Sequence, residues 1–242
     1  MDNPSTDDKF AVNRIKTGIA GLDEMLFGGL PEHSQTLVVG TPGSGKSLMT
    51  FQILYNNAKK GIPCTLILLD QKIDKFVKNA LSAFPACKDI AELEKSRALN
   101  IYERFADDKL TTRESTMLFV SSILNAIQSD NSKVVVIDSI SILRSVSVDD
   151  RAFTLIVNKL TESLDAMGVT GIVTIEASER VKGKISGLYE ESMFDGIITV
   201  KNVVKESTAQ HKINIMKFRY SNYSSAENLM EITPNGIVIK EA

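Results

Sequence analysis

The chain has 242 residues, 43% of them hydrophobic, which is enough for one large domain with a sizeable core. No apolar run reaches the roughly 18 residues that a membrane-spanning helix needs, so we expect no membrane insertion. The polar start MDNPSTDDKF is unlike a signal peptide, and the two cysteines lack framework spacing, so we expect reduced thiols in a cytoplasmic protein. A net charge of −2 excludes a global positive field that would attract nucleic acid.

Strand-like and helix-like patterns alternate through the first three quarters of the chain. We expect residues 1–12 to form a flexible tail and residues 13–242 a single domain. Apolar runs of strand length lie at residues 37–40, 64–69, 134–137 and 169–175. Helical spacing of apolar residues occurs at 48–60, 73–84, 117–127 and 147–167, with residues 85–97 ambiguous and 99–102 a short strand. This alternation predicts an α/β fold with a mostly parallel central sheet flanked by helices.

Two further local features are expected from the pattern. Ser147 and Asp150 have the spacing of an N-terminal capping box. Beyond Ser178 the chain becomes polar and forms a predicted surface loop at 178–192. The segments 197–203, 212–218, 229–232 and 237–240 follow without helices between them. They predict antiparallel strands that extend one edge of the sheet.

A phosphate-binding loop follows the predicted strand at residues 37–40. Residues 40–47 fit the pattern G-x-x-x-x-G-K-S, which begins at Gly40 and ends at Lys46 and Ser47. Glycines let backbone N–H groups turn toward a polyphosphate, and the lysine brings a positive charge to the β- and γ-phosphates. An accidental match is a weak alternative because the strand before and the helix after are present. The expected nucleotide-binding residues are Thr41, Pro42, Gly43, Ser44, Gly45, Lys46, Ser47 and Leu48.

A second nucleotide motif is expected at Asp138, which ends a buried apolar strand. A carboxylate there would hold Mg²⁺ together with the Ser47 hydroxyl, directly or through water. The alternative is an aspartate that caps a turn. With a phosphate loop upstream in a parallel sheet, the metal role is favoured, since ligands bind outside the carboxyl ends of such strands.

Other strand ends offer candidate catalytic groups. Asp70 and Gln71 follow one buried strand, and Glu176 ends another. Asp70 could polarise the water that attacks the γ-phosphate, and Gln71 or Glu176 could orient it. The alternatives, with equal weight, are a helix cap for Asp70 and an ion pair with Arg180 or Lys182 for Glu176.

Lys217 and Arg219 alternate on a late strand, so both should lie on one face. From spacing alone, a solvated face is the simpler interpretation. The same holds for the cations Arg180, Lys182 and Lys184 in the predicted loop.

Taken together, the motifs resemble the KaiC-type branch of the RecA-like ATPases, and most closely single-domain KaiC-like proteins of archaea. The segments that carry this resemblance, in the order of the family, are IKTGIAGLDEMLFGGLPE (15–32), GTPGSGKS (40–47), VVVIDSIS (134–141), GLYEESMFDGIITV (187–200), MKFRYSNY (216–223) and EITPNGIVI (231–239). The resemblance implies a RecA-like core, Mg²⁺-ATP bound between subunits, and a ring-shaped, often hexameric homo-oligomer. It also assigns Lys217 and Arg219 to the pair that reaches the neighbouring subunit's ATP.

The chain departs from the family pattern at three places. The usual Glu-Glu pair after the second core strand is Asp70-Gln71, which lacks a second acidic group. A glutamine cannot act as a base, and a misplacement of about 1 Å can cost on the order of a hundredfold in rate. The usual glycine after Lys-x-Arg is Tyr220, and the usual histidine is Tyr223. Contacts at the subunit edge are therefore expected to differ.

Three functions fit the sequence. The first is a slow ATPase whose nucleotide state controls homo-oligomer assembly and interaction with a protein partner. The second is an ATP-binding regulatory module with little or no hydrolysis, comparable to the archaellar protein FlaH. The third, least favoured, is a RadA-paralogue-like protein that binds single-stranded DNA. The predicted loop at 178–192 has one aromatic residue and three cations, a thin platform for stacking on bases.

Overall fold

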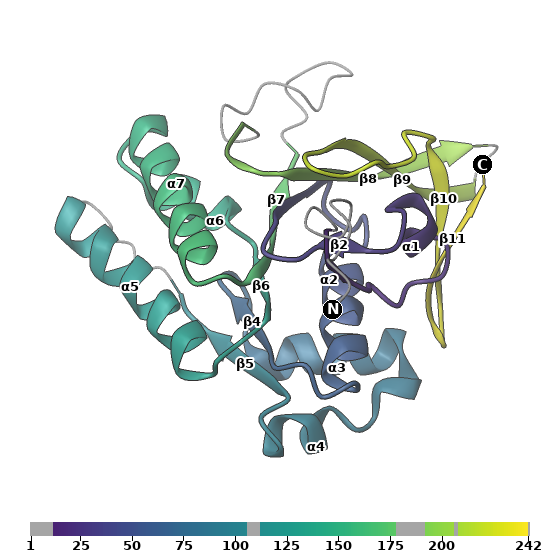
Figure 1. The fold of residues 1–242 in the computed structure, drawn as a ribbon, viewed down its shortest axis with the longest axis horizontal. Helices are drawn as coiled ribbons and strands as arrows, with labels where there is room; N and C mark the ends of the chain where they lie inside the picture. Colours follow the sequence, from purple (N-terminus) through teal and green to yellow (C-terminus); the bar gives the residue numbers. More distant parts are fainter. Residues whose placement is uncertain (1–11, 106–111, 178–191, 206–207, 242) are drawn as a thin grey trace, which may run out of the picture.

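The computed structural model of the protein describes residues 12–105, 112–177, 192–205 and 208–241. The predicted tail, apart from residue 12, and residues 178–191 of the predicted loop at 178–192 lie outside this part of the chain. The described part contains a nine-stranded sheet in the order β11-β10-β9-β8-β3-β7-β6-β4-β5 and a separate two-stranded sheet of β1 and β2 (Figure 1). No helix in the described ranges is long and apolar enough to cross a membrane.

The elements have the following bounds. The strands are β1 (Arg14–Ile15), β2 (Leu30–Pro31), β3 (Gln35–Gly40), β4 (Cys64–Leu68), β5 (Leu99–Glu103), β6 (Val134–Asp138), β7 (Thr170–Glu176), β8 (Gly196–Lys205), β9 (Thr208–Phe218), β10 (Asn228–Thr233) and β11 (Gly236–Glu241). The helices are α1 (Leu22–Met25), α2 (Lys46–Ala58), α3 (Ile73–Ala83), the 3₁₀ helix η2 (Pro85–Cys87), α4 (Ile90–Lys95), α5 (Arg113–Ser129), α6 (Ser141–Val146) and α7 (Asp150–Ala166).

The central strands are parallel and the last three are antiparallel, which confirms the predicted sheet. β3 pairs in parallel with β7 and β8, and β4 pairs in parallel with β5 and β6. The four late segments pair antiparallel with one another, as predicted, and the first of them, β8, joins the central sheet in parallel with β3. The direction of β8 depends on where the chain re-enters the sheet, which strand-length patterns do not reveal.

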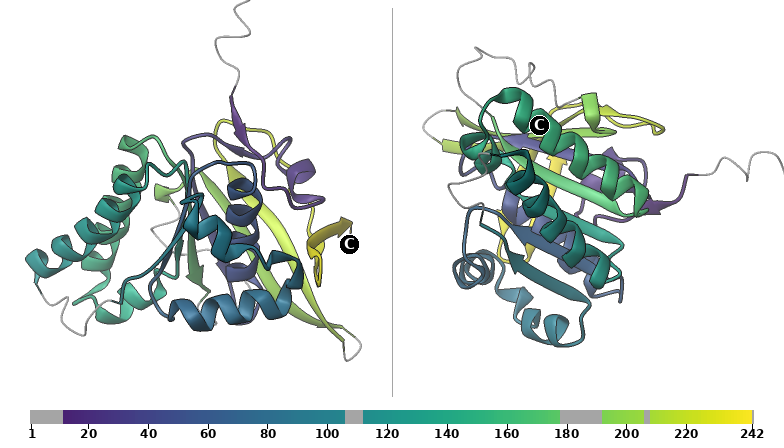
Figure 2. Two further views of the ribbon diagram at one scale, coloured as in Figure 1. Left: turned by 90° about the horizontal axis from the view of Figure 1, so that it is seen from below. Right: turned by 90° about the vertical axis from the view of Figure 1, so that its left-hand side faces the viewer.

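Helices cover both faces of the sheet, as the two views in Figure 2 show. Val38 points to the face covered by α2, α3 and α4, where it joins a core with Phe51 and Phe76. Its neighbours Leu37 and Val39 point to the other face, which α5, α6 and α7 cover. This alternation on a strand buried on both sides explains its continuous apolar sequence.

The start of α7 corrects another expectation. The predicted capping box of Ser147 and Asp150 is absent: the Asp149 carboxylate caps the helix by accepting a hydrogen bond from the Ala152 N–H at 2.7 Å. Ser147 instead donates to the Leu143 carbonyl at 2.6 Å and ends α6. Because Ser147 ends α6, the N-cap of α7 lies two residues further along the chain, at Asp149. The Asp149 side chain satisfies one of the N–H groups that a helix start leaves free.

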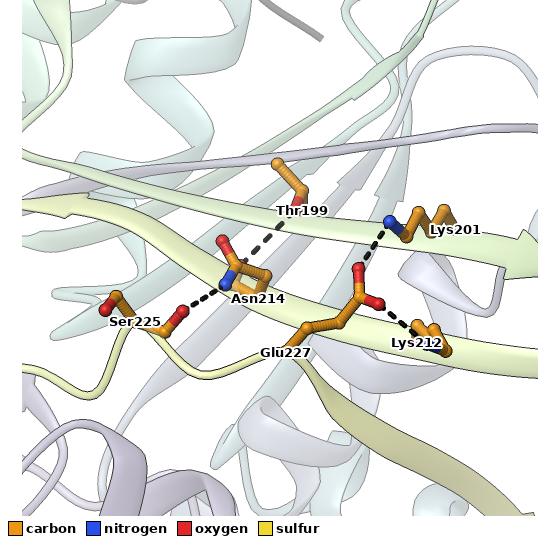
Figure 3. Close-up of polar contacts among 6 residues, drawn as sticks. All are labelled: Thr199, Lys201, Lys212, Asn214, Ser225 and Glu227. Carbon is orange, nitrogen blue, oxygen red and sulfur yellow. Dashed lines mark hydrogen bonds and ion pairs between the residues drawn. The ribbon is translucent and has the colours of Figure 1, made fainter. Parts of the chain in front are cut away.

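An ion cluster joins the chain before β10 to the β8–β9 pair (Figure 3). Lys201 and Lys212 are opposite each other across these strands, and the Glu227 carboxylate pairs with both, at 2.7 Å from Lys212. Asn214 strengthens the same junction by donating to the Ser225 carbonyl at 2.7 Å. Glu227 therefore offsets the repulsion between two facing cations. The strand that follows it, β10, packs against the phosphate loop.

Replacing Glu227 with glutamine tests this junction. The bonds from Lys201 and Lys212 hold the pKa of Glu227 below its usual range. Its stabilising contribution is therefore present above the unfolded-state pKa of about 4.3 and is lost as the pH falls through the lower folded-state value. Since Glu227 and both lysines are partly exposed, we expect Glu227→Gln to lower the free energy of unfolding by under about 1 kcal/mol at pH 7. Urea unfolding near pH 3 should show a smaller difference; an equal difference at both pH values would exclude the ion cluster as its cause.

Candidate nucleotide site

The phosphate loop turns between β3 and α2, and two of its glycines are required by the packing. A Cβ on Gly40 would lie 2.1 Å from the Val200 carbonyl oxygen. Gly45 has φ +90°, in the left-handed region that favours glycine, and a Cβ there would lie 2.9 Å from Met230 of β10. The loop is thus held between β8 and β10, which the predicted motif alone does not show.

Polar groups of the loop lack partners in the described part of the chain. The hydroxyl oxygens of Thr41 and Ser44 are buried and have no hydrogen bond to any residue that the structure describes. Lys46 is 7% exposed, and its ammonium donates to the carbonyls of Gly40 at 2.8 Å and Thr41 at 3.0 Å. Burial lowers the pKa of Lys46, while nearby carboxylates raise it. Unpaired hydroxyls beside a buried ammonium fit a polyphosphate that would supply acceptors to all three groups.

Asp138 ends β6 and presents one free carboxylate oxygen. The residue is 2% exposed; its Oδ1 accepts a hydrogen bond from the Thr174 hydroxyl, and its Oδ2 is buried without a partner in the described ranges. Within those ranges, no group of three or more His, Cys, Asp or Glu side chains could hold a metal. A magnesium ion held here would therefore need phosphate oxygens, water and the Ser47 hydroxyl as further ligands, as the chemistry of Mg²⁺ allows.

The other predicted carboxylates lie at the same rim. Asp70 follows β4 and Glu176 ends β7, and these strands flank β6 in the sheet. Burial, followed by the negative charges of Asp138 and Glu176, raises the pKa of Asp70, and Lys46 opposes this shift. The four charged groups are thus electrostatic neighbours, as the strand-end argument predicted. Gln71 is half-buried beside them.

Lys217 and Arg219 lie near the amino ends of the parallel strands, a side of the sheet that we call the amino edge. The rim with the phosphate loop lies at the carboxyl ends of these strands. Lys217 donates to the Phe194 carbonyl at 2.7 Å, and Arg219 donates to the Ser192 carbonyl at 3.1 Å. β9 is antiparallel to β8, so its end lies beside the start of β8 at Gly196, which pairs with Thr36 near the start of β3. The phosphate loop begins four residues further along β3, a rise of about 13 Å at roughly 3.3 Å per residue. These two side chains are therefore not part of the rim of their own chain.

Hydroxyl side chains that were not among the predicted site residues connect the strand ends. The Glu176 N–H donates to the Ser141 hydroxyl at 2.7 Å, and the Ser139 and Ser141 hydroxyls are hydrogen-bonded to each other at 3.0 Å. Thr174 joins the same network through its carbonyl, which accepts from Ser139, and its hydroxyl donates to Asp138. The only signal in the sequence is polar residues within or just after apolar strands. Their pairing depends on strand register, which the sequence does not show.

A family model described as "ATPase: KaiC" matches residues 15–242. The chain belongs to the KaiC ATPase family. The RecA-like α/β fold predicted from the motifs is thereby confirmed, as is the assignment of the chain to a nucleotide-binding family.

Individual relatives agree with this membership. The KaiC-type chain is 27% identical to a UPF0273 protein of Aeropyrum pernix over 239 residues, which cover 94% of each chain. It is 27% identical to the circadian clock oscillator protein KaiC of Picosynechococcus over 99% of its own length but only 47% of that protein. A crystal structure of a KaiC-like protein from Pyrococcus horikoshii superposes with a TM-score of 0.82 at 29% identity, covering 95% of this chain and all of the other.

Proposed function

We propose that this protein binds Mg²⁺-ATP at the rim formed by the phosphate loop, hydrolyses it slowly, and uses its nucleotide state to control assembly into a homo-oligomer and interaction with a protein partner. The observation that carries the proposal is the convergence of Lys46, Asp70, Asp138 and Glu176 at one edge of the sheet. When bound, Mg²⁺ would neutralise charge on the β- and γ-phosphates. In this chain Asp138 Oδ2 and the Ser47 hydroxyl would hold it, and Lys46 would contact the phosphates.

The location of Lys217 and Arg219 supports a head-to-tail assembly. Because they lie at the amino edge of the sheet, they are too far from their own rim to reach its nucleotide. If the carboxyl rim of one subunit contacts the amino edge of the next, the two cations reach a neighbour's γ-phosphate. A repeated contact of this kind closes into a ring when the rotation permits it. The family resemblance assigns the pair the same role.

Tyr220 gives independent support for a contact at the amino edge. It has φ +60°, a conformation that costs a non-glycine residue on the order of 1 kcal/mol, and it is 77% exposed. It also lines a cavity of about 470 Å³ with Met193 and with Asp195, whose carboxylate pairs with Arg219 at 3.9 Å. A large aromatic side chain at a position that favours glycine suits a role in binding another subunit.

Hydrolysis is proposed to be slow because the carboxylate pair of the family is Asp70-Gln71. The Asp70 carboxylate is one methylene shorter than glutamate, and Gln71 cannot accept a proton. The direct test is single-turnover phosphate release from ATP, measured together with solution mass for wild type and Asp70→Ala. We expect wild type to form a larger species with Mg²⁺-ATP and to release phosphate slowly, and Asp70→Ala to assemble without release. Monomeric wild type that releases no phosphate would refute the proposal.

A second candidate, a regulatory module that binds ATP without hydrolysis, is favoured by Gln71 alone. Gln71→Glu separates the two: if wild type binds ATP without turnover and Gln71→Glu gains turnover, the second candidate holds. If wild type turns over and Gln71→Glu increases the rate by roughly a hundredfold, the lower end of general-base effects, the slow ATPase holds. Binding of single-stranded DNA is not proposed, since the predicted contact loop lies mostly outside the described residues.

A further inference from the structure

We infer that Thr174 is a positioning residue for the metal-binding carboxylate of Asp138; this rests on the proposed nucleotide site. Thr174 is fully buried in β7, and its hydroxyl donates to Asp138 Oδ1 on the adjacent strand β6. Carboxylates on metals are commonly oriented by a hydrogen bond of this kind. Such a bond decides which oxygen of the carboxylate remains for the metal.

The backbone carbonyl of Thr174 also contacts the residues that directly follow β6. Its carbonyl accepts from the Ile140 N–H at 3.0 Å and from the Ser139 hydroxyl at 3.3 Å. One residue of β7 therefore contacts three successive residues at the end of β6. This fixes both the carboxylate and the backbone that carries it, so the direction of Asp138 Oδ2 is determined by Thr174.

The two carboxylate oxygens of Asp138 differ in their hydrogen bonds. This difference shows whether the bond from Thr174 orients the carboxylate or only provides a partner for a buried polar group. If the network served only to pair a buried carboxylate, both oxygens should have donors. Oδ1 has one, and Oδ2 has none in the described ranges. On the neighbouring strand β3, the Thr36 hydroxyl is equally buried and has no partner in the same part of the chain. A buried threonine in this sheet thus does not need a carboxylate acceptor.

Thr174→Val tests the inference because valine keeps the shape and removes the hydroxyl. Binding of the non-hydrolysable analogue adenylyl imidodiphosphate is measured by calorimetry with excess Mg²⁺ and with EDTA. In wild type we expect Mg²⁺ to tighten binding. In Thr174→Val we expect that gain to fall by about tenfold, the lower end of effects on such partners of metal ligands, with affinity in EDTA within twofold of wild type. Thr174→Ser, which keeps a hydroxyl, should recover most of the gain.

Thr36→Val is the matched control, since it removes a buried hydroxyl without a partner from the adjacent strand; its Mg²⁺ gain should equal that of wild type. If Thr174→Val does not fold, Thr174→Ala replaces it in the same comparison. The inference is wrong if the hydroxyl-free variant keeps the full gain, or if its affinity falls equally with Mg²⁺ and with EDTA. Absence of nucleotide binding by wild type would instead contradict the proposed function.

Discussion

Replacing Lys46 with methionine is expected to weaken ATP binding by on the order of 100-fold or more, since an ammonium at the β- and γ-phosphates makes at least two charge-assisted hydrogen bonds of about 1.5–3 kcal/mol each. The fold should tolerate the change. Lys46 is almost fully buried, burial lowers its pKa, and methionine fills a similar volume without a charge to desolvate. Calorimetric titration with ATP measures the loss, and thermal unfolding of the ligand-free protein should be unchanged or slightly higher.

Lys59→Met is the matched control, because Lys59 follows the other end of the same helix α2 and is 50% exposed. It loses an ion pair with Asp89 but should bind ATP as wild type does. If Lys46→Met binds ATP within threefold of this control, the phosphate loop is not the nucleotide site.

Replacing Arg219 with alanine is expected to reduce ATP turnover by on the order of 1,000-fold, the lower end of the range for an arginine supplied to a γ-phosphate by a partner. Because Arg219 lies at the amino edge, away from the rim of its own chain, ATP affinity of the unassembled protein should stay within twofold of wild type. Phosphate release and equilibrium binding of ATP, measured on the same preparation, separate the two effects.

Two further variants sharpen this prediction. Arg219→Lys keeps the charge but loses the planar fork of donors, so it should recover only a small part of the rate. Lys88→Ala removes an exposed positive charge beside η2 and should leave turnover unchanged. An Arg219→Ala variant with wild-type turnover would show that this side chain takes no part in hydrolysis.

The sequence predicted the carboxyl rim of the sheet well because that rim follows from simple rules. Asp70, Asp138 and Glu176 each follow a buried apolar strand, and the carboxyl ends of parallel strands meet at one edge. A linear pattern is enough to place them there once the sheet is known to be parallel. The phosphate loop is equally local, since its strand, glycines and helix are contiguous.

The remaining features depend on strand direction and register, which have no local signal. The opposite-edge location of Lys217 requires that β8 be parallel to β3 and β9 antiparallel to β8, and the first of these directions was not predicted from the sequence. The pairing of Thr174 with Asp138 depends on the register between β7 and β6. The Asp149 cap was missed because Ser147 ends α6, so the N-cap of α7 lies two residues further along the chain.

Mixing Lys46→Met with Arg219→Ala tests the central claim most directly. Each variant alone should be almost inactive, one for lack of bound ATP and the other for lack of the cation that reaches a neighbour's ATP. In a head-to-tail assembly formed by random mixing, about a quarter of the sites combine an intact phosphate loop with an intact Arg219. We predict that the equimolar mixture recovers phosphate release to roughly a quarter of the wild-type rate. A mixture whose solution mass shows that both variants assemble together, but which is no more active than its two components, would contradict an ATP site completed by the neighbouring subunit.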